Sequence, residues 1–271
     1  MAFLRPLQRS IEFCLTVLLW VYFLFGYFII LLLFFIPVYI RLKRCDAALQ
    51  KMNHLHLKCF FIWLGFLAPR TKFEIDDEVR ALRSSIIVCN HISYLDPILL
   101  VSLFPRQTTI VKNTFFRVPI FGWFLKKAGY VPSSPSEIFS PAMTVNLEGI
   151  KRHLAYGGNL FVFPEGTRGR GGRLLPFNKG VFSIARYCNT GLRLVSIRGT
   201  DSLFSPGSFS FHMLARNIIS MKVIATLTPD YQAGDFSVNV LADQAKEIFK
   251  KAASGLYGND KVQGSRFKDQ G

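Results

Sequence analysis

The sequence lacks any closely spaced pair of cysteines, although it contains 5 Cys among 271 residues. The number is odd and no Cys-x-x-Cys motif occurs, so the sequence predicts neither a disulfide framework nor a cysteine zinc site. We expect inert, buried thiols in a reducing compartment at Cys14, Cys45, Cys59, Cys89 and Cys188.

Nucleotide-binding fingerprints and acidic residues are also scarce. Neither Gly-x-x-x-x-Gly-Lys-Ser/Thr nor Gly-x-Gly-x-x-Gly occurs, which disfavours a nucleotide site of the usual kinds. The 17 acidic residues face 33 Lys and Arg, giving a formal net charge of +16. Such a charge favours a polyanionic partner, either nucleic acid or an anionic membrane surface.

One long segment carries no charge: residues 13–40 are almost wholly apolar. No small-residue cleavage site follows it, and the segment is too long for a signal-peptide core. As one helix it would extend about 40 Å, beyond a hydrocarbon core of about 30 Å. We expect a helical hairpin that dips into one leaflet, turns near Gly26 and leaves towards Pro37; a tilted single span is the alternative.

Positive residues on both sides of this segment favour the hairpin, with both ends on the cytoplasmic face. These residues are Arg5, Arg9, Arg41, Lys43 and Arg44. The apolar segment also makes a membrane the expected polyanionic partner and disfavours nucleic acid, because no comparable pattern of interleaved basic and aromatic residues occurs.

Beyond this segment, short β-branched runs alternate with longer helical patterns, which predicts an α/β fold with a mixed sheet flanked by helices. We expect an N-terminal membrane anchor over residues 1–45, one catalytic domain over 46–256 and a polar tail over 257–271. The predicted strands are 85–89, 108–111, 160–163, 192–197, 208–213 and 220–227. The predicted helices are 46–67, about 97 onward, 119–127, 141–155, 179–187 and 240–256.

A candidate acid–base pair follows the first buried strand, where the chain reads Asn90-His91-Ile-Ser-Tyr-Leu-Asp96-Pro97. Ligands of open α/β sheets usually bind at the carboxyl ends of strands, and His suits proton transfer near neutral pH. Asp96 could fold back to fix the imidazole tautomer. The alternative is that Asp96 only caps a helix in which Pro97 is the first residue. Ser93 lacks a Gly-x-Ser-x-Gly elbow, which disfavours a covalent mechanism.

A candidate anion site follows a later strand, in Pro164-Glu165-Gly166-Thr167-Arg168 and the glycine-rich run after it. Glycine allows backbone amides to approach a ligand closely, and Arg168, Arg170 and Arg173 could pair with phosphate oxygens. A solvated basic loop is the alternative.

Between the two motifs, Lys112 and Arg117 could add positive charge to the pocket. The aromatic residues of 115–123 and Tyr130 could line an acyl channel, but core packing is the favoured interpretation for most of them.

Together, Asn90-His91-x4-Asp96, the stretch 112–129 and Phe163-Pro-Glu-Gly-Thr-Arg168 resemble the glycerolipid acyltransferase family, whose best-known members are 1-acyl-glycerol-3-phosphate acyltransferases. The resemblance covers residues 84–200. It implies that His91 is the general base, that Asp96 is its partner and that no metal is needed. It also implies that residues 165–168 help to hold the acceptor's phosphate, and that acyl-CoA or acyl-carrier protein donates the acyl chain.

The sequence departs from the family pattern in two places. Val131-Pro132-Ser133-Ser134 stands where the family often has an acceptor-binding Arg, and Val195-Ser196-Ile197 replaces Val-Pro-Val/Ile. The acceptor could therefore be lysophosphatidic acid, with Arg170, Arg173 or Lys112 in place of the missing Arg, or another lysolipid such as a lyso-aminolipid. A basic membrane-binding protein without catalysis is the rival hypothesis.

Overall fold

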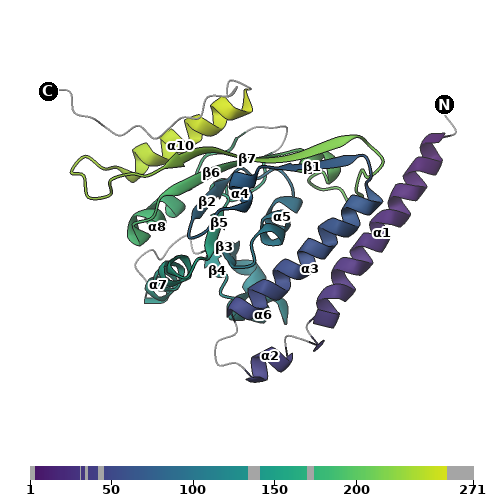
Figure 1. Ribbon diagram of the computed structural model, residues 1–271, viewed down its shortest axis with the longest axis horizontal. Helices are drawn as coiled ribbons and strands as arrows, with labels where there is room; N and C mark the ends of the chain where they lie inside the picture. The colour runs from purple at the N-terminus through teal and green to yellow at the C-terminus, as the bar shows by residue number, and fades with distance from the viewer. Residues whose placement is uncertain are drawn as a thin grey trace.

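A single sheet organises the chain, with helices on both of its faces and two long helices along one side (Figure 1). The computed structural model describes residues 4–30, 32–33, 36–41, 46–133, 141–169 and 174–254. Its helices are α1 (Leu4–Ile30), α2 (Ile36–Arg41), α3 (Asp46–Leu67), α4 (Asp77–Arg80), α5 (Leu95–Leu103), the 3₁₀ helix η2 (Asn113–Arg117), α6 (Phe121–Lys127), α7 (Pro141–Ala155), α8 (Gly180–Cys188), α9 (Thr200–Leu203) and α10 (Val238–Ala253).

The seven-stranded sheet has the order β1-β7-β6-β2-β5-β3-β4. All neighbouring strands are parallel except β6 and β7, which confirms the mixed sheet. The strands are β1 (Thr71–Ile75), β2 (Ile86–Cys89), β3 (Gln107–Lys112), β4 (Val131–Ser133), β5 (Asn159–Val162), β6 (Leu192–Arg198) and β7 (Asn217–Leu227).

Strand β2 lies at the centre of the sheet and is buried along its whole length. Successive side chains of a strand point to opposite faces. Accordingly, Ile87 joins the hydrophobic core on the side of α3 and α5, whereas Ile86 and Val88 join the core formed with α7, α8 and α10. This continuous burial fixes the position of β2, and therefore the position of His91, which lies two residues beyond its end.

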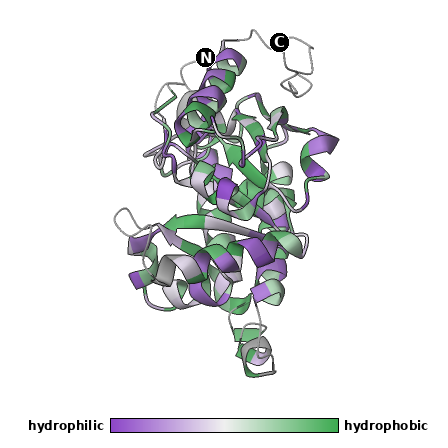
Figure 2. Cartoon of the chain, turned by 90° about the vertical axis from the view of Figure 1, so that its left-hand side faces the viewer, coloured by the Kyte–Doolittle hydropathy of each residue, from purple (hydrophilic) through white to green (hydrophobic). Residues whose placement is uncertain are grey.

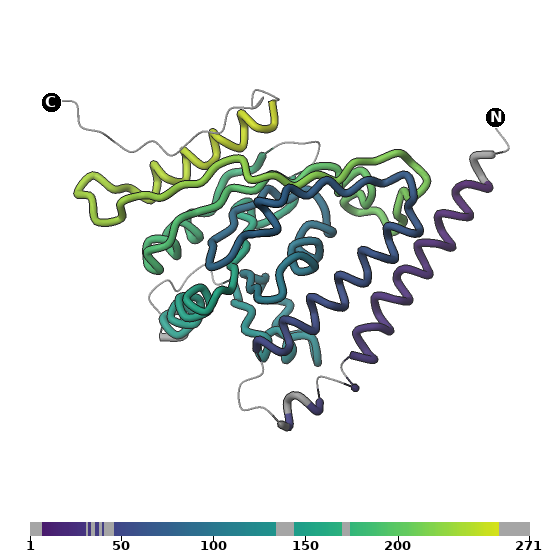
Figure 3. Tube along the Cα trace, viewed as in Figure 1, coloured from purple at the N-terminus to yellow at the C-terminus, as the bar shows by residue number. Residues whose placement is uncertain are grey.

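The N-terminal helix differs from the expectation. Helix α1 runs unbroken through Gly26, so the expected turn there is wrong. A Cβ atom at Gly26 would lie 2.3 Å from Cε1 of His56 on α3, so the glycine allows two helices to pack closely. The two helices run antiparallel (Figure 3): Tyr27 donates a hydrogen bond to Asn53 and Tyr22 donates one to His56.

Helix α1 contains a stretch, Leu7–Ile30, that is long and apolar enough to cross a membrane. Most of its large apolar side chains are exposed. Together these features indicate membrane association. The division into an anchor over 1–45 and a separate catalytic domain stays a prediction, although α3 packs against α1 as well as against α5.

The sequence pattern missed two strands and predicted one strand that does not form. The edge strands β1 and β4 were missed, and β4 contains Pro132, a residue tolerated in a sheet mainly at edges. Residues 208–213 form a loop and not a strand. Its apolar pattern arises because Phe211 and Met213 are buried against the α1 side of the core, where the Phe211 amide donates to the Thr16 hydroxyl.

The expectation of buried thiols is wrong for Cys14 and Cys59, which are exposed on the outer surfaces of α1 and α3. Cys89 and Cys188 are buried as expected, and all four are free. Cys45 lies outside the described residues.

Candidate active site

The His91 and Asp96 side chains meet at the carboxyl edge of the sheet. His91 Nδ1 lies 2.9 Å from Asp96 Oδ2, and the imidazole is 16% exposed while the carboxylate is fully buried. The imidazole stacks on the Phe163 ring with 4.3 Å between centroids. Because Asp96 occupies Nδ1, Nε2 is the nitrogen left to accept a proton from a substrate.

Asp96 is not a helix cap. Tyr94 is the N-cap of α5, and Asp96 lies within the first turn of that helix. Its Oδ2 atom accepts hydrogen bonds from the Ile92 and Ser93 amides, both at 2.7 Å. These amides and the positive end of the helix stabilise the carboxylate and aim it at His91. The capping interpretation is therefore wrong because the carboxylate turns towards the preceding loop.

Thr200, which sequence reasoning missed, completes the shell around Asp96. Its buried hydroxyl donates to Asp96 Oδ1 at 2.5 Å. It begins α9 directly after Gly199, whose φ is +79°. A Cβ atom at Gly199 would lie 2.0 Å from the Ile218 carbonyl oxygen, so only glycine allows this turn. Nothing local in the sequence marks Thr200, since it lies 104 positions from Asp96.

Asn90 anchors the strand end that presents His91. Its side-chain amide donates to the Ile197 carbonyl and accepts from the Ile197 amide, each at 2.8 Å. These two bonds hold the loop after β2 against the end of β6. The same stretch, 195–200, therefore positions both the loop before the imidazole and the carboxylate.

Glu165 braces the loop after β5 against the dyad. Its Oε1 accepts from the His91 amide and its Oε2 accepts from the Leu175 amide, both at 2.9 Å. Burial raises the pKa of Glu165 above its usual value, and the two amide hydrogen bonds offset only part of this shift. Because both carboxylate oxygens accept backbone amides, the geometry gives Glu165 a positioning role beside the phosphate role that the resemblance implies.

The loop between 163 and 169 is held by the protein and is not freely solvated. The Gly169 amide donates to the His91 carbonyl at 2.9 Å, and the Gly166 amide donates to Phe163. Gly166 has φ +64° and is exposed, as is Thr167. Their backbone and hydroxyl groups are accessible to a ligand.

Arg168 is the cation that the structure brings to this loop. Its guanidinium lies over the Tyr94 ring, 3.3 Å from the centroid. Its Nη1 atom is buried and has no hydrogen-bond partner among the described residues. A buried guanidinium nitrogen without a partner is costly unless an anion binds it. Arg170 and Arg173 lie outside the described residues, so their contribution stays a prediction.

Lys112 ends β3, two strands from β2, and is exposed. The aromatic residues that follow were expected to pack mainly in the core. That expectation is wrong for Phe115, Phe121 and Trp123, which are exposed. It holds for Tyr130, which is buried, and Phe116 packs against the same cluster under α3.

Ser93 is unsuited to covalent catalysis. Its buried hydroxyl donates to the Phe204 carbonyl at 2.7 Å and accepts from the Leu95 amide. It therefore fixes the start of α5, and its hydroxyl is not bonded to the His91 imidazole.

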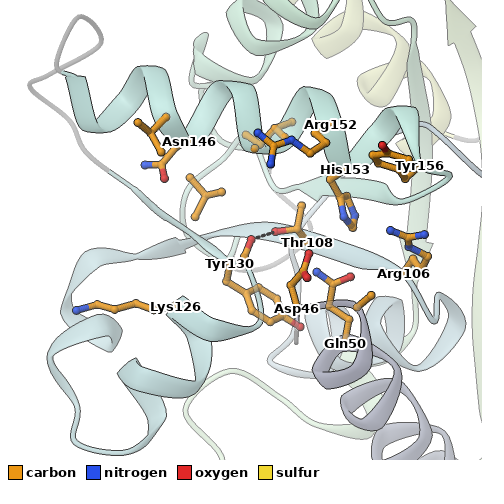
Figure 4. A pocket seen from close by; sticks show the side chains of 16 residues that line it. Asp46, Gln50, Arg106, Thr108, Lys126, Tyr130, Asn146, Arg152, His153 and Tyr156 are labelled. Atoms are coloured by element: carbon orange, nitrogen blue, oxygen red, sulfur yellow. Dashed lines mark hydrogen bonds between the residues drawn. The ribbon is translucent and has the colours of Figure 1, made fainter. Parts of the chain in front are cut away.

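A cleft of about 450 Å³ lies away from this dyad, between α7, the start of α3 and the strands β3 and β4 (Figure 4). Its polar lining residues include Asp46, Gln50, Arg106, Arg152 and His153. Arg106 directly precedes β3, so this part of the cleft lies at the amino end of a strand whose carboxyl end faces the His91 edge. Neither His91 nor Asp96 lines this cleft.

The mixed sheet, with a histidine paired to a buried carboxylate at the carboxyl end of its central strand, defines the class of α/β protein to which the chain belongs. Residues 70–198 match the family described as Acyltransferase. The 1-acyl-sn-glycerol-3-phosphate acyltransferase of Saccharomyces cerevisiae is 30% identical over 201 residues, which cover 70% of this chain and 65% of that protein. The chloroplastic 1-acyl-sn-glycerol-3-phosphate acyltransferase BAT2 of Brassica napus is 32% identical over 170 residues, 60% of this chain and 47% of that protein.

The crystal structure of the LPA acyltransferase PlsC from Thermotoga maritima has the same fold, with a TM-score of 0.66 and 22% identity. The match covers 94% of this chain and 99% of that chain. The family match and the curated relatives support the glycerolipid acyltransferase family that the sequence motifs predicted. It spans about half to two thirds of the length of the two curated relatives described above.

Proposed function

We propose that this protein is an O-acyltransferase that moves a fatty acyl chain from an acyl thioester to the free hydroxyl of a lysophospholipid. The observation that carries the proposal is the buried Asp96 carboxylate bonded to Nδ1 of His91, which leaves Nε2 to act as a base. The proposed acceptor is 1-acyl-glycerol-3-phosphate, which the names of the curated relatives support. The proposed role is phospholipid biosynthesis.

The proposed reaction is a direct transfer. Nε2 of His91 removes the proton of the acceptor hydroxyl as its oxygen attacks the thioester carbonyl carbon. The tetrahedral intermediate then collapses, the carbon–sulfur bond breaks and the imidazolium returns its proton to the thiolate that leaves. Asp96 stabilises the imidazolium without taking its proton. The scheme requires no metal and no cofactor apart from the donor.

Arg168 is the described residue best suited to bind the acceptor's phosphate, because its Nη1 atom is buried and unpartnered. Lys112, Arg170 and Arg173 are proposed to supply the charge of the Arg that is missing after Tyr130. Another lysolipid, such as a lyso-aminolipid, is the alternative acceptor. Acyl-CoA and acyl-carrier protein remain the two candidate donors, since both carry negative charge that a +16 chain attracts.

The proposed location is a membrane, with the catalytic domain on its cytoplasmic face. Helix α1 supports the membrane part of this proposal, and the net charge of +16 suits the anionic lipids of a cytoplasmic leaflet.

The test is acyl transfer by membranes that contain the full chain, with labelled acyl-CoA or acyl-carrier protein and a panel of lysolipids. We expect the membranes to convert lysophosphatidic acid to phosphatidic acid. Transfer to a different lysolipid alone would refute the acceptor but keep the chemistry. Absence of transfer from both donors to every acceptor would refute the reaction and favour a non-catalytic membrane-binding protein.

A further inference from the structure

A second apolar surface, separate from α1, covers the segment 113–123, which contains η2 and the start of α6. Five large apolar side chains between positions 115 and 123 are 36–63% exposed: Phe115, Val118, Ile120, Phe121 and Trp123. No residue of η2 is buried. Scattered exposed apolar residues are common on soluble proteins, but a concentration of this kind marks an interaction site.

The backbone of this segment holds its apolar side chains outward. Ile120 has φ +65° and ψ −57°, and the Phe121 amide donates to the Pro119 carbonyl at 2.6 Å, which closes a tight γ-turn. A β-branched residue rarely adopts a positive φ. A Cβ atom at Gly122 would lie 2.2 Å from the Phe116 carbonyl oxygen, so only glycine allows η2 to approach α6 so closely. Strain of this type persists where the surrounding structure maintains it, often at functional sites.

The segment lies beside the catalytic edge. Strand β3 ends at Lys112, directly before η2, and it is parallel to β5 and β2. The carboxyl ends of these three strands therefore lie at the same edge of the sheet, and His91 follows β2. Two strand spacings of about 4.8 Å place the end of β3 roughly 10 Å to the side of the end of β2.

The segment also adjoins the N-terminal helices. Leu125 and Ala128, at the end of α6, pack against Leu49 in α3. A few residues along α3, Asn53 accepts a hydrogen bond from Tyr27 near the end of α1. The exposed apolar residues of the last turns of α1 therefore lie at the same end of the molecule as α6, as does the largely hydrophobic α2 (Figures 1 and 2).

We propose that the 113–123 segment inserts into the interface of the bilayer that holds α1, so that the protein has two separate membrane contacts. The occupant of this surface is a phospholipid leaflet with anionic headgroups. Exposed Lys112, Arg117 and Lys126 flank the apolar side chains and match that charge. Aromatic side chains are favoured at the membrane interface, where one end is apolar and the other is hydrated.

This second contact brings the carboxyl edge of the sheet to the lipid surface. An acceptor and product that reside in the leaflet would then reach His91 without crossing water. The inference goes beyond the proposed reaction and does not depend on the identity of the acceptor.

The first test measures fluorescence quenching of Trp123. In the variant Trp20→Phe/Trp63→Phe, Trp123 is the sole tryptophan. We reconstitute the full chain in nanodiscs that contain anionic lipid, with or without bromine on the acyl chains. We expect a blue-shifted emission and a loss of about half of its intensity in the brominated discs.

The matched control moves the sole tryptophan to an exposed site at the opposite end of the molecule, by adding Val240→Trp on α10 and Trp123→Phe. Emission from position 240 should not change with bromination. Equal emission of Trp123 in both kinds of disc would overturn the proposal. Blue-shifted emission that appears only on addition of acyl-carrier protein would also overturn it and would assign the surface to that acidic partner.

The second test compares a bilayer with a soluble substrate. Ile120→Ser/Phe121→Ser should lower acyl transfer about tenfold with a long-chain acceptor embedded in vesicles, yet leave transfer to a short-chain, monomeric acceptor unchanged. Val240→Ser, an exposed change far from the segment, should affect neither rate. Equal rates of the double variant and the wild type on vesicles would contradict the proposal. Absence of transfer by the wild type to the monomeric acceptor would instead count against the proposed reaction.

Discussion

At the scale of single residues, the Asp96 carboxylate is surrounded by donors from its own loop and from a distant turn. Oδ2 accepts from His91 Nδ1 and from the Ile92 and Ser93 amides, and Oδ1 accepts from Thr200. Because both oxygens of this buried carboxylate have hydrogen-bond partners, the side chain is held in a single orientation. In the proposed transfer, this fixed carboxylate would stabilise the imidazolium that forms at His91.

Replacing Thr200 with Val removes one donor from Asp96 while it keeps the shape of the side chain. One lost hydrogen bond of about 1 kcal/mol should lower kcat about fivefold, with little change in KM because Thr200 is fully buried and bonded to Asp96. Thr200→Ser, which retains the hydroxyl, should restore most of kcat. Steady-state kinetics of both variants provides the check.

The control for this pair is Thr108→Val, which removes another largely buried hydroxyl, bonded to the Gly129 carbonyl. It should lower the melting temperature without a selective effect on kcat. A Thr200→Val enzyme with a wild-type kcat, or a Thr200→Ser enzyme as slow as Thr200→Val, would refute the positioning role.

The sequence predicted the dyad because its members are five positions apart and follow a buried strand. It could not predict Thr200 or the two amide bonds of Glu165, since these contacts join segments that meet only after the sheet forms. The capping interpretation failed for a related reason. Asp-Pro at a helix start is compatible with two orientations of the carboxylate, and only the position of the imidazole distinguishes them.

At the scale of elements, a chain of buried polar side chains joins α1 to the sheet. Tyr27 bonds to Asn53 on α3, Asn53 donates to the Tyr130 hydroxyl, and that hydroxyl donates to Gln107 on β3. Burial raises the pKa of Tyr130 to about 12, so the hydroxyl keeps its proton and donates at neutral pH. The membrane helix is therefore tied to the sheet through specific contacts.

Replacing Tyr130 with Phe should break this chain at its centre. The change leaves the Asn53 amide and the Gln107 oxygen without the partner they share, at a cost of about 1–3 kcal/mol in the free energy of unfolding. We expect a lower melting temperature in nanodiscs and a kcat close to wild type, because the residue is remote from the dyad. Tyr156→Phe, at an exposed hydroxyl, is the control. Equal melting temperatures of the two variants would contradict this account.

The end of α7 should make stability depend on pH. Burial lowers the pKa of His153, although its contact with the Asn159 carbonyl raises it. Because the folded state disfavours the charged ring, His153 contributes its full stabilisation above its pKa in the unfolded chain, about 6.5. That stabilisation is lost as the pH falls towards the lower pKa of His153 in the folded state.

The replacement His153→Gln should therefore weaken the fall in melting temperature between pH 7.5 and pH 5. The exposed residue His212, replaced in the same way, should leave that fall as it is in the wild type. An identical pH dependence in the wild type and His153→Gln would show that the buried imidazole does not titrate in this range.

The N-terminal segment shows where reading single elements from sequence fails. Its length and lack of charge predicted a membrane helix, but Gly26 was interpreted as a turn when it permits contact with His56. Helix α1 packs against α3, whose mixed composition did not reveal which face would meet α1, and also against the loop that contains Phe211. The exposed aromatic residues of 115–123 were assigned to the core for a similar reason, because sequence alone does not distinguish lipid from protein as an apolar neighbour.

At the scale of the whole molecule, the edge of the sheet that carries His91 lies beside the exposed apolar surface of residues 113–123. The sheet delivers His91 at the carboxyl ends of its central strands, and the end of β3 continues into the exposed 113–123 segment. The alternation of strands and helices was sufficient to predict the mixed sheet. The strand order, with its antiparallel β6–β7 pair, was not predictable, because it depends on long-range pairing.

The central claim is that His91 is the base of an acyl transfer, and the most direct measurement is the rate of that transfer with His91→Ala. The variant should form phosphatidic acid from lysophosphatidic acid about a thousandfold more slowly than the wild type, the usual scale for loss of a general base. Membrane attachment should persist. The exposed His212→Ala variant should retain full activity, as a control for the loss of an imidazole. Wild-type rates in His91→Ala would contradict the account.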